Sequence, residues 1–354
     1  MKLMRAFTLA LAALAGLGLA AQAPRLVVGA VYVGSVNDYG YNRSFHDALG
    51  RLAKDLPGVK VLEAENVPET GEAERVMEGM IQQGARLMFP TSFGYQDSAR
   101  RVAKRHKEVA FEFAGDGDAT RNFGVFFGST QAAWYPMGVA AGRMTRSNKL
   151  GFVIGMPIGY ALGNVNAFQM GARSVNPKAV TVVVVTGGWS DKAREAGAAN
   201  ALLDQGCDVL AMHVDSPATI IQAAEARGAM SIGFQSVEAR ALAPRGWICG
   251  LGFNWGPFMA RQAEAVLGGR FRGEAVYQGL GQMVEMAPFG ARVPADVQKL
   301  VRDAAAKVAG GFNPFTGPLN DNQGRLVLPP GASVGADQMG GLNWYVEGVV
   351  GKVR

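Results

Sequence analysis

The chain has 354 residues, of which 49% are hydrophobic and 18% are charged. At about 150 residues per domain, this length favours two domains or one large one, and the apolar content excludes a disordered protein. Two cysteines are too few for a disulfide scaffold or a cysteine-rich zinc site. The formal net charge is +6, but the basic residues are scattered and not interleaved with aromatic residues, which argues against a nucleic-acid groove.

The first segment predicts export. Lys2 and Arg5 precede an uncharged apolar stretch from Ala6 to Ala21, and small residues follow, which is the arrangement of a secretory signal peptide. The stretch is shorter than the roughly 20 residues that span a membrane, although an uncleaved anchor is the alternative. We therefore expect a signal peptide over residues 1–21, with no cysteine nearby for lipid attachment, and a soluble exported protein.

After residue 25, runs of β-branched residues alternate with amphipathic helices. In the first half we expect strands at 26–33, 59–63, 85–89 and 109–113 and helices at 45–54, 71–84, 96–106 and 132–144. The pattern then restarts, with strands at 149–154, 181–185, 209–213 and 230–233 and helices at 163–175, 192–205 and 217–227. This alternation predicts βαβ crossovers and parallel sheets. The strand runs lack period-two alternation, so we expect both faces of each strand to be covered.

Two such units in series predict a two-lobed α/β molecule, joined near residues 146–148. The helix at 255–267 is expected to return to the first lobe, and residues 311–330 read as turns and a hairpin. We therefore expect lobe 1 to comprise residues 24–146 and about 253–272. Lobe 2 is expected to comprise residues 147–252 and about 273–354.

Motifs of catalysis are missing from the sequence. It contains no G-x-S-x-G elbow, Walker loop, H-E-x-x-H or C-x-x-C motif, so we predict a non-enzyme without metal or cofactor. His213 ends a predicted strand, where it either faces a cleft or is a satisfied structural residue. Cys207 and Cys249 are either two buried small hydrophobes or, in an oxidising compartment, a disulfide.

Residues that directly follow the predicted strands are the candidates for a ligand site. In open α/β sheets, ligands bind outside the carboxyl ends of the strands. The segments at 35–42, 91–95, 187–191 and 254–255 hold aromatic and small polar residues, which suit a flat ring that is stacked on its faces and hydrogen-bonded at its edge. The candidates are Asp38, Tyr41, Asn42, Ser92, Phe93, Trp189, Asp191, Asn254 and Trp255.

Each candidate also has a purely structural interpretation. Asp38 and Asp191 are each suited to cap the helix that follows. Tyr41 and Trp189 are equally suited to the hydrophobic core, and Trp255 to packing the last helix onto its lobe. The shared location of these residues after strands, more than any one of them, favours the ligand site.

Several segments carry a family resemblance when taken in order: GSVNDYGYNRSFH (34–46), TSFGYQD (91–97), GVAAGRMTRSNK (138–149), NAFQMGARSVNP (166–177) and FTGP (315–318). Together they resemble the basic-membrane-protein family of ABC-transporter substrate-binding proteins. The resemblance implies a type I periplasmic-binding-protein fold, in which two Rossmann-like lobes joined by a multi-strand hinge clamp a ligand. It also implies a monomeric periplasmic receptor that delivers its ligand to ABC permease subunits and does not bind nucleic acid.

The resemblance also implies roles for particular residues. Tyr41 and Trp189 look like ring-stacking residues. Asp38, Asn42 and Ser92 look like polar contacts from the first lobe. The facing side is implied to be lined by Asp191 and Asn254.

Two departures from the nucleoside-binding members bear on the ligand. Those members carry an Asp that holds the ribose where this chain has Gln235, and a Lys near the position of Asn254. The loss of two charged groups weakens a ribose clamp, because hydrogen bonds to charged groups are the stronger ones. We therefore predict a purine receptor that prefers a free base such as adenine, with Glu112 as a possible edge contact. The alternatives are a purine nucleoside, riboflavin or a sugar and, more distantly, a nucleoside hydrolase.

Overall fold

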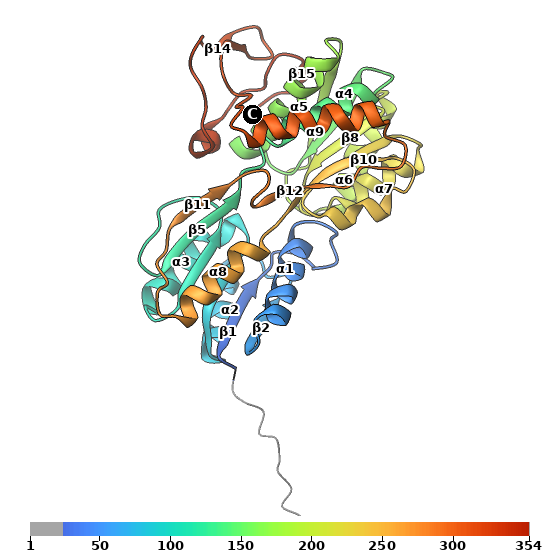
Figure 1. Ribbon diagram of the computed structural model, residues 1–354. Helices are drawn as coiled ribbons and strands as arrows, with labels where there is room; N and C mark the ends of the chain where they lie inside the picture. Colours follow the sequence, from blue (N-terminus) through green and yellow to red (C-terminus); the bar gives the residue numbers. More distant parts are fainter. Residues whose placement is uncertain (1–23, 354) are drawn as a thin grey trace, which may run out of the picture.

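The computed structural model describes residues 24–353, so the predicted signal peptide lies outside the described residues. The chain forms two α/β lobes stacked end to end (Figure 1), and the predicted two-lobed α/β architecture is confirmed. The first described residues lie at the far end of the lower lobe, and the C-terminus lies on the upper lobe. Within residues 24–353, no helix has the length and apolarity needed to cross a membrane.

The first lobe is built on a six-stranded sheet with the order β11-β5-β4-β3-β1-β2, in which all pairs are parallel. One face of this sheet is covered by α1 and α8 and the other by α2 and α3. The elements are β1 (Leu26–Val31), α1 (Tyr41–Asp55), β2 (Val59–Ala64), α2 (Gly71–Gln82), β3 (Ala85–Pro90), α3 (Gln96–Arg105), β4 (Ala110–Ala114), β5 (Phe123–Gly128), α8 (Gly256–Leu267) and β11 (Ala275–Gln278).

The second lobe is built on a seven-stranded sheet with the order β12-β10-β9-β8-β6-β7-β15, in which only β12 is antiparallel to its neighbour. Its elements are α4 (Trp134–Met144), β6 (Lys149–Ile154), α5 (Gly159–Val175), β7 (Val180–Val185), α6 (Lys192–Asp204), β8 (Val209–His213), α7 (Ala218–Ala226), β9 (Met230–Gly233), β10 (Trp247–Phe253), β12 (Val284–Ala287), α9 (Ala295–Ala309) and β15 (Val349–Val350). Helices α6 and α7 pack against the sheet, α4 and α5 pack against each other, and α9 packs on α4. The predicted hairpin is formed by β13 (Leu319–Asn320) and β14 (Leu326–Leu328).

The described chain passes between the lobes three times, through residues 129–133, 254–255 and 279–283. The helix expected at 255–267 does return to the first lobe, where α8 packs against α1 and β3. Two boundaries differ from the expected ones. The first crossing falls before α4, not near residue 146, and β11 pairs with β5 in the first sheet, beyond the expected limit near residue 272.

Helix α4 belongs to the second lobe because glycines let it approach α5 closely. A Cβ atom added at Gly138 would overlap the carbonyl oxygen of Phe168, and one added at Gly171 would overlap the carbonyl oxygen of Tyr135. Only residues without a side chain permit backbones this near to each other. The small-residue composition of α4 therefore serves helix–helix packing.

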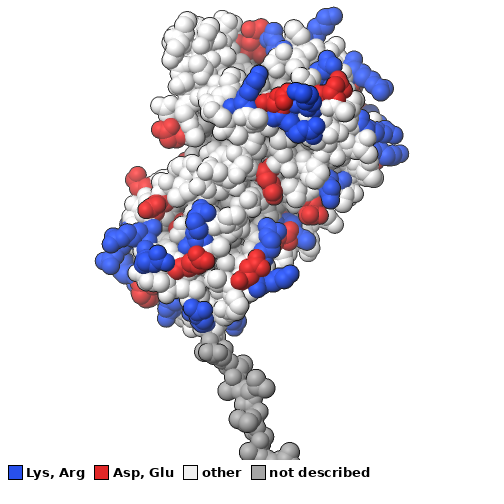
Figure 2. Space-filling view, in the orientation of Figure 1, with Lys and Arg blue, Asp and Glu red and all other residues white. Residues whose placement is uncertain are grey.

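Two strands are less covered than predicted. The valine-rich β7 is only half-buried, because its outer neighbour β15 pairs with Thr181 and Val182 alone. Strand β2 is likewise partly exposed at the edge of the first sheet. Cys207 and Cys249 are both buried and unpaired, so the structure supports the interpretation as small hydrophobes and not as a disulfide. Figure 2 shows basic and acidic side chains mixed over both lobes on the visible face.

Candidate functional site

A cavity that is partly open to solvent lies between the two lobes. Residues from both lobes line it, and each of them ends a parallel strand, lies near its carboxyl end or follows it. This is the position at which open α/β sheets bind ligands. The lining residues are Tyr41, Ser92, Phe93, Ala114, Gly115, Phe127, Ile158, Tyr160, Trp189, His213, Asp215 and Gln235.

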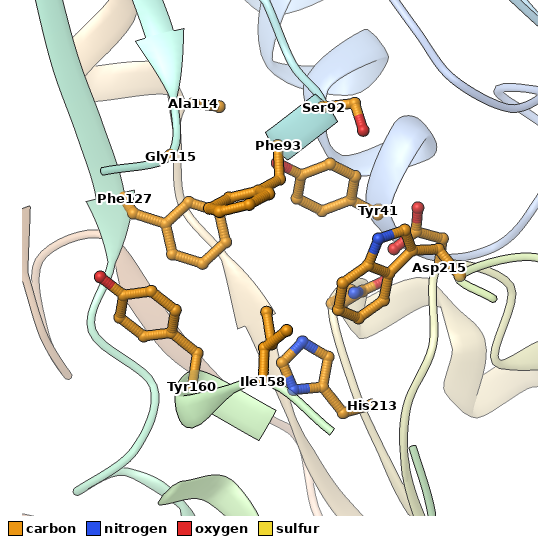
Figure 3. Close-up of a pocket in the computed structure, with 12 residues that line it drawn as sticks. Tyr41, Ser92, Phe93, Ala114, Gly115, Phe127, Ile158, Tyr160, His213 and Asp215 are labelled. Carbon is orange, nitrogen blue, oxygen red and sulfur yellow. The ribbon is translucent and has the colours of Figure 1, made fainter. Parts of the chain in front are cut away.

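The first-lobe wall is mainly aromatic. The Tyr41 hydroxyl donates to the carbonyl oxygen of Thr91 at 2.5 Å, and its ring packs against Phe45 at a centroid distance of 5.1 Å. The side chain of Phe93 is 45% exposed and projects over the cavity beside Phe127 (Figure 3). A partly exposed aromatic ring in a cavity offers a face on which a flat ligand can stack.

The second-lobe wall combines rings with polar groups. Trp189 lies 5.7 Å from His213 between ring centroids, and His213 packs edge-on against Phe234 at 5.0 Å. Figure 3 shows Ile158 and His213 across the open space from Phe93 and Phe127. Aromatic and imidazole rings from both lobes therefore line the cavity.

A buried carboxyl lies at one side of the cavity. Burial raises the pKa of Asp215 well above its usual value, the nearby Asp38 carboxylate raises it further, and a hydrogen bond from Gln235 opposes this shift. Gln235 has a positive φ of 75°, and its Oε1 is buried without a partner among the described residues. Strained backbone and unsatisfied buried acceptors are unfavourable in a free protein, and they concentrate at ligand sites.

Hydrogen bonds join the two lobes around the cavity. The backbone N–H of Tyr41 donates to the carbonyl oxygen of Asp215 at 3.1 Å. The Tyr160 hydroxyl donates to Asp116 Oδ2 at 3.2 Å. Each bond pairs one residue of the first lobe with one of the second, so the structure shows the lobes in contact.

Five of the predicted site residues line the cavity: Tyr41, Ser92, Phe93, Trp189 and Gln235. The hydroxyl of Ser92 is already engaged, since it donates to Glu69 Oε1 at 2.5 Å. The ring of Tyr41 is 6% exposed and packs mostly within the core. Phe93 and Trp189 are the better placed of these aromatic residues for stacking.

Asp38 and Asn42 lie behind the cavity wall and do not line it. The Asp38 carboxylate accepts hydrogen bonds from the backbone N–H groups of Gly40, Asn42 and Arg43 at 2.8 to 3.1 Å. The Asn42 side chain donates to the same carboxylate at 2.8 Å. Both residues hold the start of α1, so capping accounts for Asp38.

Asp191, Asn254 and Trp255 are also absent from the lining. Asp191 caps α6 by accepting from the backbone of Ala193 and Arg194. Asn254 lies in the second crossing and donates to the carbonyl oxygen of Gln282 in the third, at 3.3 Å. Trp255 is fully buried, stacks between the rings of Phe45 and Phe253, and donates to Ser44 Oγ. These contacts match the capping and packing interpretations. Glu112, the suggested edge contact, is buried in β4 beside Gly124 and does not line the cavity either.

Sequence reasoning missed Asp215, Phe127 and Tyr160 and left the role of His213 open. Asp215 follows β8. It therefore fits the same criterion as the other candidates, which was a position just after a predicted strand. Tyr160 and Ile158 similarly follow β6. Phe127 lies within β5, a strand that was not predicted and whose sequence, FGVFFG, contains two glycines.

Comparison with known proteins identifies the family. Residues 25–309 match the family model described as Bmp, ABC transporter substrate-binding protein PnrA-like. The chain is 34% identical over 332 residues to a purine-binding protein of Brucella abortus, covering 93% of this chain and 94% of the relative. It is 31% identical over 278 residues, which are 77% of this chain and 69% of the relative, to a Haloferax volcanii protein named provisionally as an ABC transporter glucose-binding protein.

Among solved structures, an ABC transporter solute-binding protein of Conexibacter woesei superposes with a TM-score of 0.68 at 25% identity. The superposition covers 81% of this chain and 97% of that one. This likeness, with the two parallel-sheet lobes and the crossings between them, confirms the type I periplasmic-binding-protein fold. The chain belongs to the Bmp family of PnrA-like ABC transporter substrate-binding proteins.

Proposed function

We propose that this protein is the periplasmic receptor of an ABC importer and captures a purine, with a free base such as adenine preferred. One observation carries the proposal. Aromatic rings from both lobes surround the cavity, and His213, Asp215 and Gln235 place polar groups together on the second lobe. A flat ring with a polar edge suits such a site. The name of the Brucella relative supports the same class of ligand.

The function is capture and not catalysis. When the lobes close, rings cover the faces of the base and polar groups replace water at its edge. Hydrogen bonds strengthen in the water-excluded cavity. Because a ligand shifts the open–closed equilibrium only by its differential affinity for the two states, residues of both lobes contribute to binding. The closed form would then present a joint surface of both lobes to the permease.

A free base is preferred over a nucleoside because the cavity holds few groups for a ribose. Asp215 is the only acidic residue among those that line the cavity, and neither Lys nor Arg is among them. The resemblance implies that Gln235 replaces the ribose-binding Asp of the nucleoside-binding members. Without a charged clamp, the ribose hydroxyls have weaker partners.

A sugar is the second candidate, because the Haloferax relative is named for glucose. Each sugar hydroxyl needs a hydrogen-bond partner. Five of the twelve lining residues carry a phenyl, phenol or indole ring, and the Ser92 hydroxyl is already engaged with Glu69. This lining favours a purine over a sugar.

Thermal unfolding of the ligand-stripped protein tests the proposal. Adenine, guanine, hypoxanthine, adenosine, guanosine, ribose, glucose and riboflavin are added separately. A ligand at 100 times its Kd stabilises the protein by about 2.7 kcal/mol, which raises the midpoint by several degrees. We expect a free base to raise it more than its nucleoside does. A response to nucleosides alone would overturn the base preference, and a response to glucose alone would favour the sugar.

The variant Trp189→Ala tests the stacking role. We expect its purine Kd to rise at least tenfold, about 1.4 kcal/mol, because a ring contact is lost while the fold is retained. Isothermal titration calorimetry measures the change. Trp344→Ala is the matched control, since it removes the same side chain outside the cavity lining. Unchanged binding by Trp189→Ala would remove this residue from the site.

A further inference from the structure

A chain of buried side chains leads from the first crossing to the cavity. The Thr130 hydroxyl donates to Asn164 Oδ1 at 2.9 Å, and Asn164 Nδ2 lies 2.9 Å from His213 Nδ1. Thr130 is in the crossing between β5 and α4, Asn164 is in α5, and His213 ends β8. Their exposed fractions are 2%, 0% and 8%.

The orientation of the Asn164 amide assigns the position of the imidazole proton. An amide oxygen only accepts and an amide nitrogen only donates. In the structure Asn164 Oδ1 faces Thr130 and the Asn164 NH₂ group faces His213. A donor can meet only a ring nitrogen that carries no proton, so Nδ1 of His213 is the acceptor.

The imidazole is also neutral. Burial lowers the pKa of His213 to about 4, so at pH 7 the ring carries a single proton. Since Nδ1 accepts from Asn164, that proton is on Nε2. Figure 3 shows one ring nitrogen of His213 directed toward the open space of the cavity, and with Nδ1 occupied by Asn164 this nitrogen is Nε2.

We propose that His213 is a specificity-determining residue whose Nε2–H donates to an unprotonated ring nitrogen of the base, and that Asn164 and Thr130 are positioning residues that set its tautomer. The inference rests on the proposed function and extends it to the atoms of the base. His213 ends β8 and Asp215 follows it, and Gln235, whose Oε1 has no partner among the described residues, follows the neighbouring strand β9. A fixed donor on His213 beside the free acceptor of Gln235 matches a base with a ring nitrogen next to an amino group.

This arrangement predicts the class of purine. An aminopurine such as adenine presents an acceptor nitrogen beside an amino donor, whereas hypoxanthine replaces the amino group with a carbonyl oxygen. With hypoxanthine, an acceptor meets the acceptor of Gln235, and leaving such a buried group unpaired is costly. We expect adenine to bind at least tenfold more tightly than hypoxanthine.

Nitrogen NMR of the imidazole rings tests the tautomer directly, without any ligand. Two-bond ¹⁵N–¹H correlations at pH 7 identify the protonated nitrogen of each of the three histidines, and His213→Gln assigns the His213 signal by its loss. We expect the proton on Nε2 in the wild type and a mixture of tautomers in Asn164→Leu. Thr130→Val should shift the same equilibrium, because it frees the amide to turn over. A proton on Nδ1 in the wild type would overturn the proposal.

Binding of adenine and its deaza analogues tests the donor. Each analogue replaces one ring nitrogen with C–H and so removes one acceptor. We expect one analogue to bind the wild type at least tenfold more weakly than adenine. His213→Leu should bind adenine and that analogue equally, and Asn164→Leu should lose part of the discrimination. His213→Gln should retain part, because its amide nitrogen reaches about as far as Nε2.

The outcomes separate this inference from the function on which it rests. Equal weakening of adenine and the critical analogue in His213→Leu indicates a merely structural role and would overturn the inference alone. A wild type that binds adenine and every deaza analogue equally tightly would also overturn the inference alone. Failure of every purine to bind the wild type would overturn the proposed function, and the donor role with it.

Discussion

The buried carboxyl of Asp215 shows at the scale of a residue how a binding site opposes stability. Its pKa is raised by burial first, and by the carboxylates of Asp38, Glu69 and Glu195 in addition. A carboxyl whose pKa is raised on folding binds more protons in the native than in the unfolded state, so the free energy of unfolding falls as pH rises above about 4. Side chains that serve ligand binding often lower the free energy of unfolding in this way.

Asp215→Asn should therefore stabilise the ligand-free protein at neutral pH while it weakens purine binding. We expect its midpoint of thermal unfolding to exceed that of the wild type by at least about 2 °C at pH 8, with a smaller difference at pH 5. Differential scanning fluorimetry across this range measures both. Asp303→Asn, exposed on α9, is the control. A difference that does not depend on pH would contradict the assigned cause.

Sequence patterns located part of the site for a clear reason. Phe93 and Trp189 were found because they are aromatic residues that follow strands. For Asp38 and Asp191 the sequence did not distinguish helix capping from ligand binding, because a capping carboxylate occupies the same place after a strand as a ligand-binding one. The tautomer of His213 was beyond sequence reasoning, since it depends on Asn164, which meets His213 only in the folded lobe.

At the scale of an element, the pairing of α4 with α5 depends on glycines. Gly138 and Gly171 sit where any side chain would overlap the backbone of the opposite helix. Helix propensity alone favours Ala over Gly, so these glycines oppose local stability in favour of packing. An amphipathic pattern indicates that one face of a helix is buried, but it does not indicate which sheet that face packs against. For this reason α4 was expected in the first lobe, whereas it belongs to the second.

Gly138→Ala should destabilise the protein by about 2 kcal/mol or more, because the added methyl group forces the two helices apart. Gly197→Ala in α6 is the matched control, since a Cβ atom there meets nothing within 4 Å. That change should stabilise the protein by about 0.5 to 1 kcal/mol through helix propensity. Urea denaturation gives both values, and effects of equal sign would contradict the packing argument.

At the scale of the whole molecule, the lobes meet where Gly40 precedes α1. A Cβ atom at Gly40 would overlap the carbonyl oxygen of Asp215 and the ring of Pro217, which both belong to the second lobe. The two-lobed architecture followed from the repeated strand–helix pattern. The sequence pattern did not predict how closely the two lobes approach each other, because that distance depends on contacts between residues far apart in the chain.

Gly40→Ala should hinder closure without altering the cavity lining. We expect the purine Kd to rise at least tenfold. Small-angle X-ray scattering should show a smaller ligand-induced decrease in radius of gyration than in the wild type. Gly50→Ala, on the solvent side of the same helix, has no neighbour within 4 Å and serves as the control. Equal contraction in both variants would show that closure does not require this close approach.

The pairing of β11 with β5 has a consequence for the newly made chain. Strand β5 ends at Gly128, but the strand that completes its sheet begins at Ala275, and α8 comes only shortly before it. At ~5–20 residues per second, a ribosome needs on the order of ten seconds to make the intervening segment. During that interval β5 remains an open edge and the face later covered by α8 stays bare. The first lobe therefore begins first and finishes only after five of the seven strands of the second-lobe sheet have been synthesised.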